Sequence, residues 1–84
     1  MPDIESELSI RRRIGQCEQD MKRAAERSTD ALTNFRRATI LADTPAQIDL
    51  DLVEAAMQDL KAARVAFLAA IKEKRELESR LGVA

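Results

Sequence analysis

The amino-acid sequence predicts an all-α fold in which two long antiparallel helices form a helical hairpin of the coiled-coil type. Three observations lead to this prediction. The chain is dominated by Ala, Leu, Glu, Lys and Arg, with only 2 Gly and 2 Pro among 84 residues, a composition typical of long helices. Signals for a turn gather at one place near the middle of the chain. Apolar residues follow a seven-residue repeat on both sides of that place.

The first helix is expected to span about residues 3–41. Acidic residues such as Glu7 stand near its start, and Arg36 and Arg37 stand near its end. Because the helix dipole is positive at the N-terminus and negative at the C-terminus, this distribution of charge favours a helix over the whole segment. No proline interrupts it.

The turn is expected at about residues 42–44 and the second helix at about residues 45–81. Thr44 is a favourable N-cap, Pro45 suits the first helical position, and Gln47 stands where a capping box places its returning side chain. Since a connection of a few residues forces two helices to run antiparallel, these signals predict a hairpin.

Each helix carries an apolar seam at alternating four- and three-residue spacing, with a small residue at every seventh position. The small residues are Cys17, Ala24, Ala31 and Ala38 in the first helix and Ala56, Ala63 and Ala70 in the second. Folding the chain at residues 42–44 aligns Ala24 with Ala63 and Met21 with Phe67. Small residues in facing positions let two helix axes approach to about 8 Å. This shared register favours a single helical-hairpin domain over residues 1–84.

The second helix carries more apolar residues than one seam can bury. Residues 62–71 read AARVAFLAAI, with Arg64 as the one polar side chain, so this stretch is apolar around most of its circumference. We call the predicted interface residues off the seam the surplus face: Met57, Arg64, Val65, Leu68 and Ile71. Leu32 of the first helix extends it. Small domains commonly need oligomerisation, and exposed apolar patches mark interfaces. We therefore expect a two-fold dimer of hairpins that forms a four-helix bundle.

The residue inventory argues against an enzyme and against a bound metal or cofactor. The chain has no His and a single Cys, so the common zinc ligand sets and a His-activated thiol are both missing. Cys17 falls on a small seam position, where a thiol packs much like Ala. Glu73 and Glu76 would suit acid–base chemistry if they were buried. Arg80 follows Glu76 at the i,i+4 spacing of a surface ion pair, which predicts a solvated face instead.

An arginine-rich flank of the first helix suggests an alternative function, nucleic-acid binding. Its residues are Arg11, Arg12, Arg13 and Arg23. The chain balances 14 basic with 15 acidic residues, and its two aromatic residues, Phe35 and Phe67, both fall on the seams instead of among these arginines. The sequence therefore favours a protein partner over nucleic acid.

The function expected from the sequence is protein binding. We expect a small adaptor, chaperone or inhibitor that acts as a homodimer and docks an unidentified protein on its helical surface. A structural component of a larger particle is a further alternative. No apolar run reaches the roughly 18 residues of a membrane span, and the N-terminus lacks the order of a signal peptide. We therefore expect a cytoplasmic protein without membrane contact.

Overall fold

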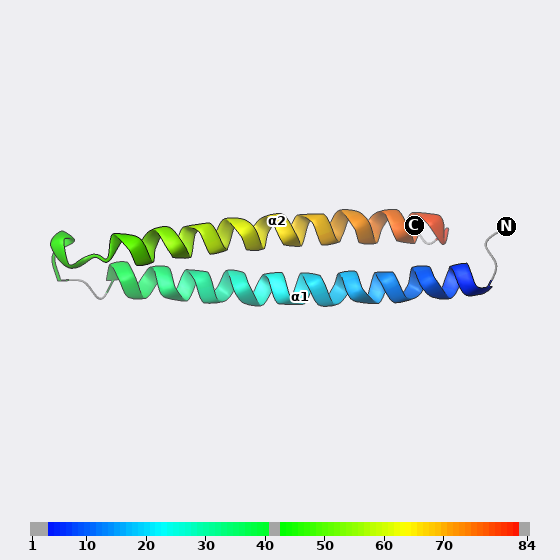
Figure 1. Cartoon of the computed structure of the whole chain (residues 1–84), viewed down its shortest axis with the longest axis horizontal. Helices are drawn as coiled ribbons and strands as arrows, with labels where there is room; N and C mark the ends of the chain where they lie inside the picture. Colours follow the sequence, from blue (N-terminus) through cyan, green and yellow to red (C-terminus); the bar gives the residue numbers. More distant parts are fainter. Residues whose placement is uncertain (1–3, 41–42, 83–84) are drawn as a thin grey trace.

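The computed structural model describes residues 4–40 and 43–82, which form two long helices and a short connection (Figure 1). Helix α1 spans Ile4–Ile40, the short 3-10 helix η1 spans Pro45–Gln47, and helix α2 spans Leu50–Arg80. The two long helices lie side by side and run in opposite directions, so the predicted helical hairpin is confirmed. The molecule is a rod of 64 × 18 × 13 Å, in which the described helices α1 and α2 form a single layer.

The long second helix begins later than the sequence predicts. The sequence places its start at about Pro45, whereas α2 begins at Leu50. Ile48 has an extended backbone, with φ −71° and ψ 123°, and therefore separates η1 from α2. Asp49 is the N-cap of α2, because its Oδ1 accepts a hydrogen bond from the backbone N–H of Leu52 at 3.1 Å.

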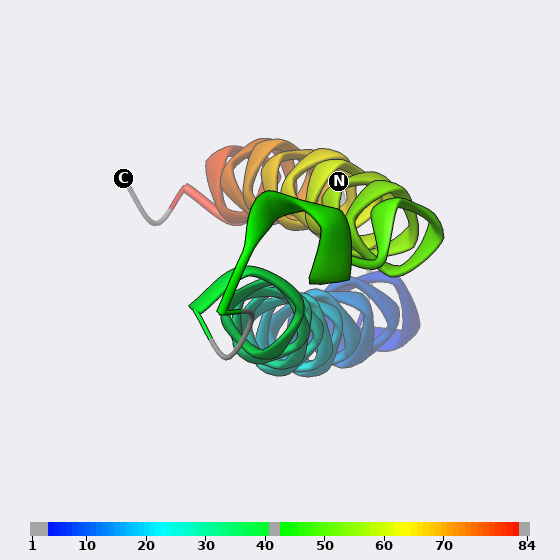
Figure 2. The same cartoon turned by 90° about the vertical axis from the view of Figure 1, so that its left-hand side faces the viewer.

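The predicted capping-box contact of the Gln47 side chain does form, but it caps only the short helix η1. Oε1 of Gln47 accepts hydrogen bonds from the backbone N–H groups of Thr44 at 3.2 Å and Asp43 at 2.6 Å. Figure 2 looks onto this end of the molecule, where the connection lies across the ends of both long helices. Residues 3, 41 and 42, which the sequence assigned to the first helix and the turn, lie outside the described residues.

The core is a line of small side chains between the two helices. All seven small seam residues are buried, with exposed fractions between 0% and 7%: Cys17, Ala24, Ala31, Ala38, Ala56, Ala63 and Ala70. The larger seam residues Met21 and Phe67 are only half-buried, and Phe35 stays 38% exposed. The two helices enclose the small side chains but leave one side of most large ones open to solvent; Leu77, which is 7% exposed, is the exception.

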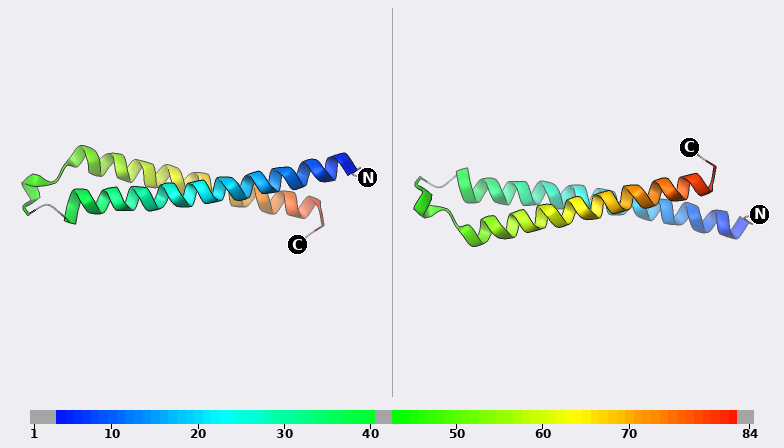
Figure 3. Two further views of the ribbon diagram at one scale, coloured as in Figure 1. Left: turned by 90° about the horizontal axis from the view of Figure 1, so that it is seen from below. Right: turned by 90° about the horizontal axis from the view of Figure 1, so that it is seen from above.

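The register of the two helices agrees with the predicted one. Ala24 and Ala63 line the same two hollows, which places them at one level of the hairpin. The ion pair between Arg27 and Asp59 falls within one residue of this register. Figure 3 shows that the helices cross at a shallow angle near the middle of their length. Neither described helix combines the length and the apolar character that a membrane crossing requires.

Candidate protein-binding surface

The two long edges of the hairpin differ in chemistry. The first, which we call the charged edge, carries two of the three ion pairs that join the described helices: Arg13 with Glu73 and Arg27 with Asp59. Each of these four residues directly precedes a seam residue. Successive residues of a helix point about 100° apart, so the residues directly before and directly after a seam residue lie on opposite sides of the seam. The residues that directly follow the small seam residues therefore lie on the opposite edge of the hairpin. The third ion pair, Glu18 with Lys74 at 3.7 Å, lies toward the open end of that edge, because Glu18 directly follows the small seam residue Cys17. That opposite edge is the candidate site.

We call the second edge the apolar edge. Its members in the middle of the rod are Ala25 and Leu32 of α1 and Met57 and Arg64 of α2, together with Leu68, which lines one hollow with Ala25 and Arg64. Leu32 is 45% exposed, Met57 58% and Leu68 56%, although all three are large apolar side chains. Contiguous apolar exposure on a small protein marks an interaction surface.

The apolar edge contains two neighbouring hollows. The hollow between the helices is lined by Ala24, Ala25, Ser28, Ala63, Arg64, Phe67 and Leu68. The hollow on the outer side of α2 is lined by Met57, Gln58, Leu60, Lys61, Arg64, Val65 and Leu68. Arg64 and Leu68 belong to both and therefore form the ridge that separates them. Such a surface can accept apolar side chains of a second helix on either side of that ridge.

Four of the five predicted residues of the surplus face are exposed, and the fifth is not. Met57, Arg64, Val65 and Leu68 are all exposed, Val65 to 61%. The sequence also predicts an exposed Ile71 in the isolated hairpin, but Ile71 is half-buried. Ile71 directly follows the buried Ala70, just as the exposed Arg64 directly follows the buried Ala63, so its place in the repeat does not by itself set its exposure.

The apolar surface continues toward the connection. Ile40 is 70% exposed, Leu50 69% and Leu52 41%. Leu50 stands seven residues before Met57 and therefore extends the apolar edge to the start of α2. The apolar edge thus runs along more than half of α2.

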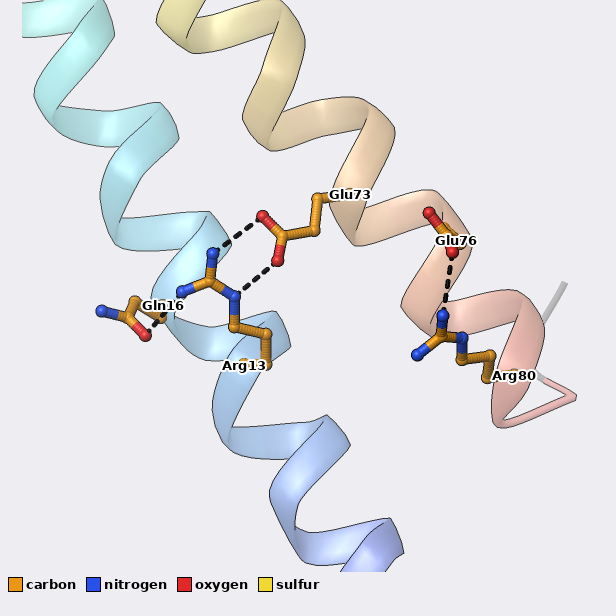
Figure 4. A network of polar contacts seen from close by, with 5 residues as sticks. All are labelled: Arg13, Gln16, Glu73, Glu76 and Arg80. Atoms are coloured by element: carbon orange, nitrogen blue, oxygen red, sulfur yellow. Dashed lines mark hydrogen bonds and ion pairs between the residues drawn. The ribbon is translucent and has the colours of Figure 1, made fainter.

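The charged edge holds a bidentate ion pair near the end of the hairpin opposite the connection (Figure 4). The Arg13 guanidinium donates from Nε to Oε1 of Glu73 at 2.5 Å and from Nη2 to Oε2 at 2.9 Å. Its Nη1 also donates to Oε1 of Gln16 at 2.9 Å. The hydrogen bond from Arg13 lowers the pKa of Glu73, and the same bond raises the pKa of Arg13. Glu76 and Arg80 form the predicted i,i+4 pair at 3.0 Å.

Cys17 lies in the core beside this ion pair. Its side chain is fully buried. Burial raises the pKa of Cys17, and the negative charge of Glu73 raises it further. A thiol held in its protonated form is a poor nucleophile, which agrees with the structural role that the sequence predicts for Cys17.

The three consecutive arginines of the alternative nucleic-acid site, Arg11, Arg12 and Arg13, project from α1 in different directions. Arg11 is bonded to Glu7 at 3.1 Å, and Arg13 is bonded to Glu73. Arg12 and Arg23 are exposed. Three consecutive helical residues point in three directions, so the run at residues 11–13 does not present its charges to a single phosphate backbone.

Sequence reasoning missed the contacts that tie the two helices together at the charged edge. Arg13 and Glu73 directly precede the seam residues Ile14 and Lys74. Opposite charges at these positions beside the seam were the signal in the sequence that could have predicted an ion pair between the helices. It also missed that Ala25 and Ser28 of α1 complete one of the two hollows.

Among residues 4–40 and 43–82, no group of three or more His, Cys, Asp or Glu side chains is placed to hold a metal ion. In comparisons with known proteins, no family model, no curated protein and no solved structure matches the chain. The functional proposal therefore rests on the geometry of the hairpin.

Proposed function

We propose that this chain is a non-catalytic protein-binding module, of the adaptor, chaperone or inhibitor class, that acts as a homodimer of helical hairpins. The observation that carries the proposal is the apolar edge, on which Leu32, Met57 and Leu68 are each about half exposed or more. A large apolar side chain contributes roughly 1.5–3 kcal/mol when it moves from water into a protein interface.

The small core of the hairpin supports the same proposal. Of the eight buried side chains in the described part of the chain, seven are Ala or Cys, and Leu77 is the eighth. Burial stabilises in proportion to apolar area, so a core of small side chains contributes little for its length. Covering the apolar edge would add the large side chains that the hairpin alone leaves open, including Phe35 and Phe67.

The mechanism of binding is helix packing on the apolar edge. A helix laid along this edge places apolar side chains in the two hollows on either side of Arg64 and Leu68. A second copy is the simplest partner because it is always present. The dimer then offers other proteins the apolar side chains near the connection that stay outside this contact, such as Ile40 and Leu52.

Light scattering over the micromolar range tests the dimer. The expected mass is twice that of the 9.4 kDa chain. Changing Val65→Lys and Leu68→Lys together places two charges on the apolar edge and should give monomers or unfolded chains. The matched control is Ala62→Lys, which adds a charge at an exposed position on the opposite side of α2 and should leave the mass unchanged. A well-folded wild-type chain that stays at 9.4 kDa throughout would rule out the dimer.

The two alternatives give different results in simple measurements. Nucleic-acid binding would weaken steeply with salt and would be lost when Arg11, Arg12 and Arg13 are changed to Glu. The engagement of Arg11 and Arg13 by carboxylates does not favour it. A structural component of a larger particle would form species beyond a dimer as its concentration rises.

A further inference from the structure

A second line of residues with alternating four- and three-residue spacing runs along α2 beside the seam that packs on α1. Its members, which we call the second seam, are Leu50, Glu54, Met57, Lys61, Arg64 and Leu68. All six are exposed. This spacing is the one that lets a helix pack along another helix over many residues.

The three charged members of the second seam have no partner within their own hairpin. Five ion pairs connect side chains of the described residues, and Glu54, Lys61 and Arg64 take part in none of them. None of the three makes a side-chain hydrogen bond within residues 4–40 and 43–82 either. Both signs of charge are therefore available on one exposed apolar stripe.

We propose that the occupant of the apolar edge is a second copy of this chain, with α2 packed antiparallel on α2 through the second seam. This inference rests on the homodimer proposed above and specifies its interface. In this register Leu50 lies opposite Leu68 of the second copy, and Glu54 lies opposite Arg64 of the second copy. Under two-fold symmetry each contact occurs twice. A Leu50–Leu68 contact therefore lies at each end of the interface, and two Glu54–Arg64 pairs of opposite charge lie between them.

Charge selects this register among the neighbouring ones that keep the second seam facing itself. Sliding one copy by seven residues in one direction puts Lys61 opposite Arg64 of the second copy, so two cations meet at the centre. Sliding it by seven residues in the other direction puts Arg64 and Leu68 opposite residues that precede the start of α2 at Leu50. Like charges and lost contacts exclude wrong registers in helix pairs.

The outer hollow of α2 lies on the second seam. Met57, Lys61, Arg64 and Leu68 are four of its lining residues. In the proposed register Met57 of the second copy lies opposite Lys61 and therefore enters this hollow. The long aliphatic part of Lys61 covers that methionine while its ammonium group stays in water.

The other helix gives an independent check. The two-fold axis crosses α2 at the level of Asp59, and Asp59 is bonded to Arg27 of α1 at 3.1 Å. The axis therefore passes α1 close to residue 27. An antiparallel arrangement of α1 about that level places Glu18, which also lies 3.7 Å from Lys74 of its own hairpin, opposite Arg36 of the second copy.

Charge reversal at positions 54 and 64 tests the register. In Glu54→Arg each dimer has two pairs of facing arginines, and in Arg64→Glu it has two pairs of facing glutamates. Each variant alone should have a dimer Kd about tenfold higher than the wild type at low salt. An equal mixture of the two should form heterodimers of about wild-type affinity, because both facing pairs are then of opposite charge. The double variant should regain the homodimer for the same reason.

The control variant is Lys72→Glu, which reverses an exposed cation of α2 outside the second seam and should leave the Kd unchanged. Positions 54 and 64 are about 15 Å apart along one helix, so a direct effect within one chain does not account for the rescue. Sedimentation with one fluorescently labelled chain measures both Kd and heterodimer formation, and circular dichroism shows that each variant stays helical. A dimeric wild type whose variants neither weaken nor rescue one another would overturn this register but keep the proposed function. A monomeric wild type would overturn both.

Discussion

Arg13 of α1 holds both carboxylate oxygens of Glu73 of α2, with the shorter contact at 2.5 Å and the longer at 2.9 Å. The planar guanidinium matches a carboxylate in this two-point geometry, which fixes orientation as well as distance. The pair joins positions 60 residues apart in the chain, near the end where no connection holds the helices together. It therefore helps to keep the hairpin closed at its open end.

The Arg13–Glu73 pair should make stability depend on acid pH. Arg13 lowers the pKa of Glu73 below its ordinary value of 4.5, so the contribution of the pair is fully present above pH 4.5 and is lost as the pH falls through the lowered pKa. Glu73→Gln should show a smaller loss of stability in this range, with a difference that shrinks in high salt. Urea unfolding between pH 2 and pH 6 measures this loss of stability. The control is Glu76→Gln, which also removes one carboxylate but breaks an ion pair within a single helix. Identical acid profiles for wild type and Glu73→Gln would contradict the prediction.

Enlarging a small seam residue should destabilise the hairpin. Ala63 is 1% exposed and lies at the level of Ala24, so Ala63→Leu has no room unless the helices move apart. Overfilling a close-packed core costs about 1–3 kcal/mol. Thermal unfolding should show the loss, whereas Ala62→Leu, at an exposed position one residue away, should change stability by no more than about 0.5 kcal/mol. Equal midpoints for the two variants would mean that the helices are not in close contact at Ala63.

The Cys17 thiol should be protected in the folded chain. Its side chain is fully buried and burial raises its pKa above the ordinary value of 9.0. Reaction with a thiol reagent at neutral pH should therefore be much slower in buffer than in urea. The same shift of the pKa makes stability depend on alkaline pH. The stabilisation from burying the neutral thiol is fully present below pH 9.0 and is lost as the pH rises through the raised pKa. Cys17→Ala should remove this alkaline dependence, and equal reaction rates in buffer and urea would show that the thiol is not buried.

Removing the N-cap of α2 should weaken the start of the helix. Asp49 accepts a hydrogen bond from the Leu52 N–H, and loss of such a cap costs about 1 kcal/mol. We expect that loss in Asp49→Ala and near-complete retention of stability in Asp49→Asn, because Asn caps about as well. Asp51→Ala is the control, since Asp51 lies in the first turn of α2 and is not its cap. Thr44→Ala should destabilise the chain less than Asp49→Ala, because Thr44 is the N-cap of the short helix η1 and not of α2. A larger loss of stability in Thr44→Ala than in Asp49→Ala would place the start of α2 at Pro45.

Much of the fold and part of the candidate site follow from residue order alone. The direction of a side chain from a helix depends on its position along the helix, so the seven-residue repeat was enough to identify the small residues of the core. For the same reason the sequence identified Met57, Val65 and Leu68 as apolar residues off the seam, and all three are exposed. The connection was also found, because prolines and caps act locally.

Only the tertiary structure decided the features that depend on two segments at once. Thr44 and Asp49 are both good caps, and which of them begins the long helix depends on how the chain turns to bring α2 onto α1. The half-burial of Ile71 and the 38% exposure of Phe35 depend on the distance and crossing of the helices, which no single-helix pattern contains. The Arg13–Glu73 pair likewise needs two positions 60 residues apart at one level and on one edge. The sequence by itself determined which faces the helices bury, and helix packing decided which edge is held by charge and which edge is left apolar and open.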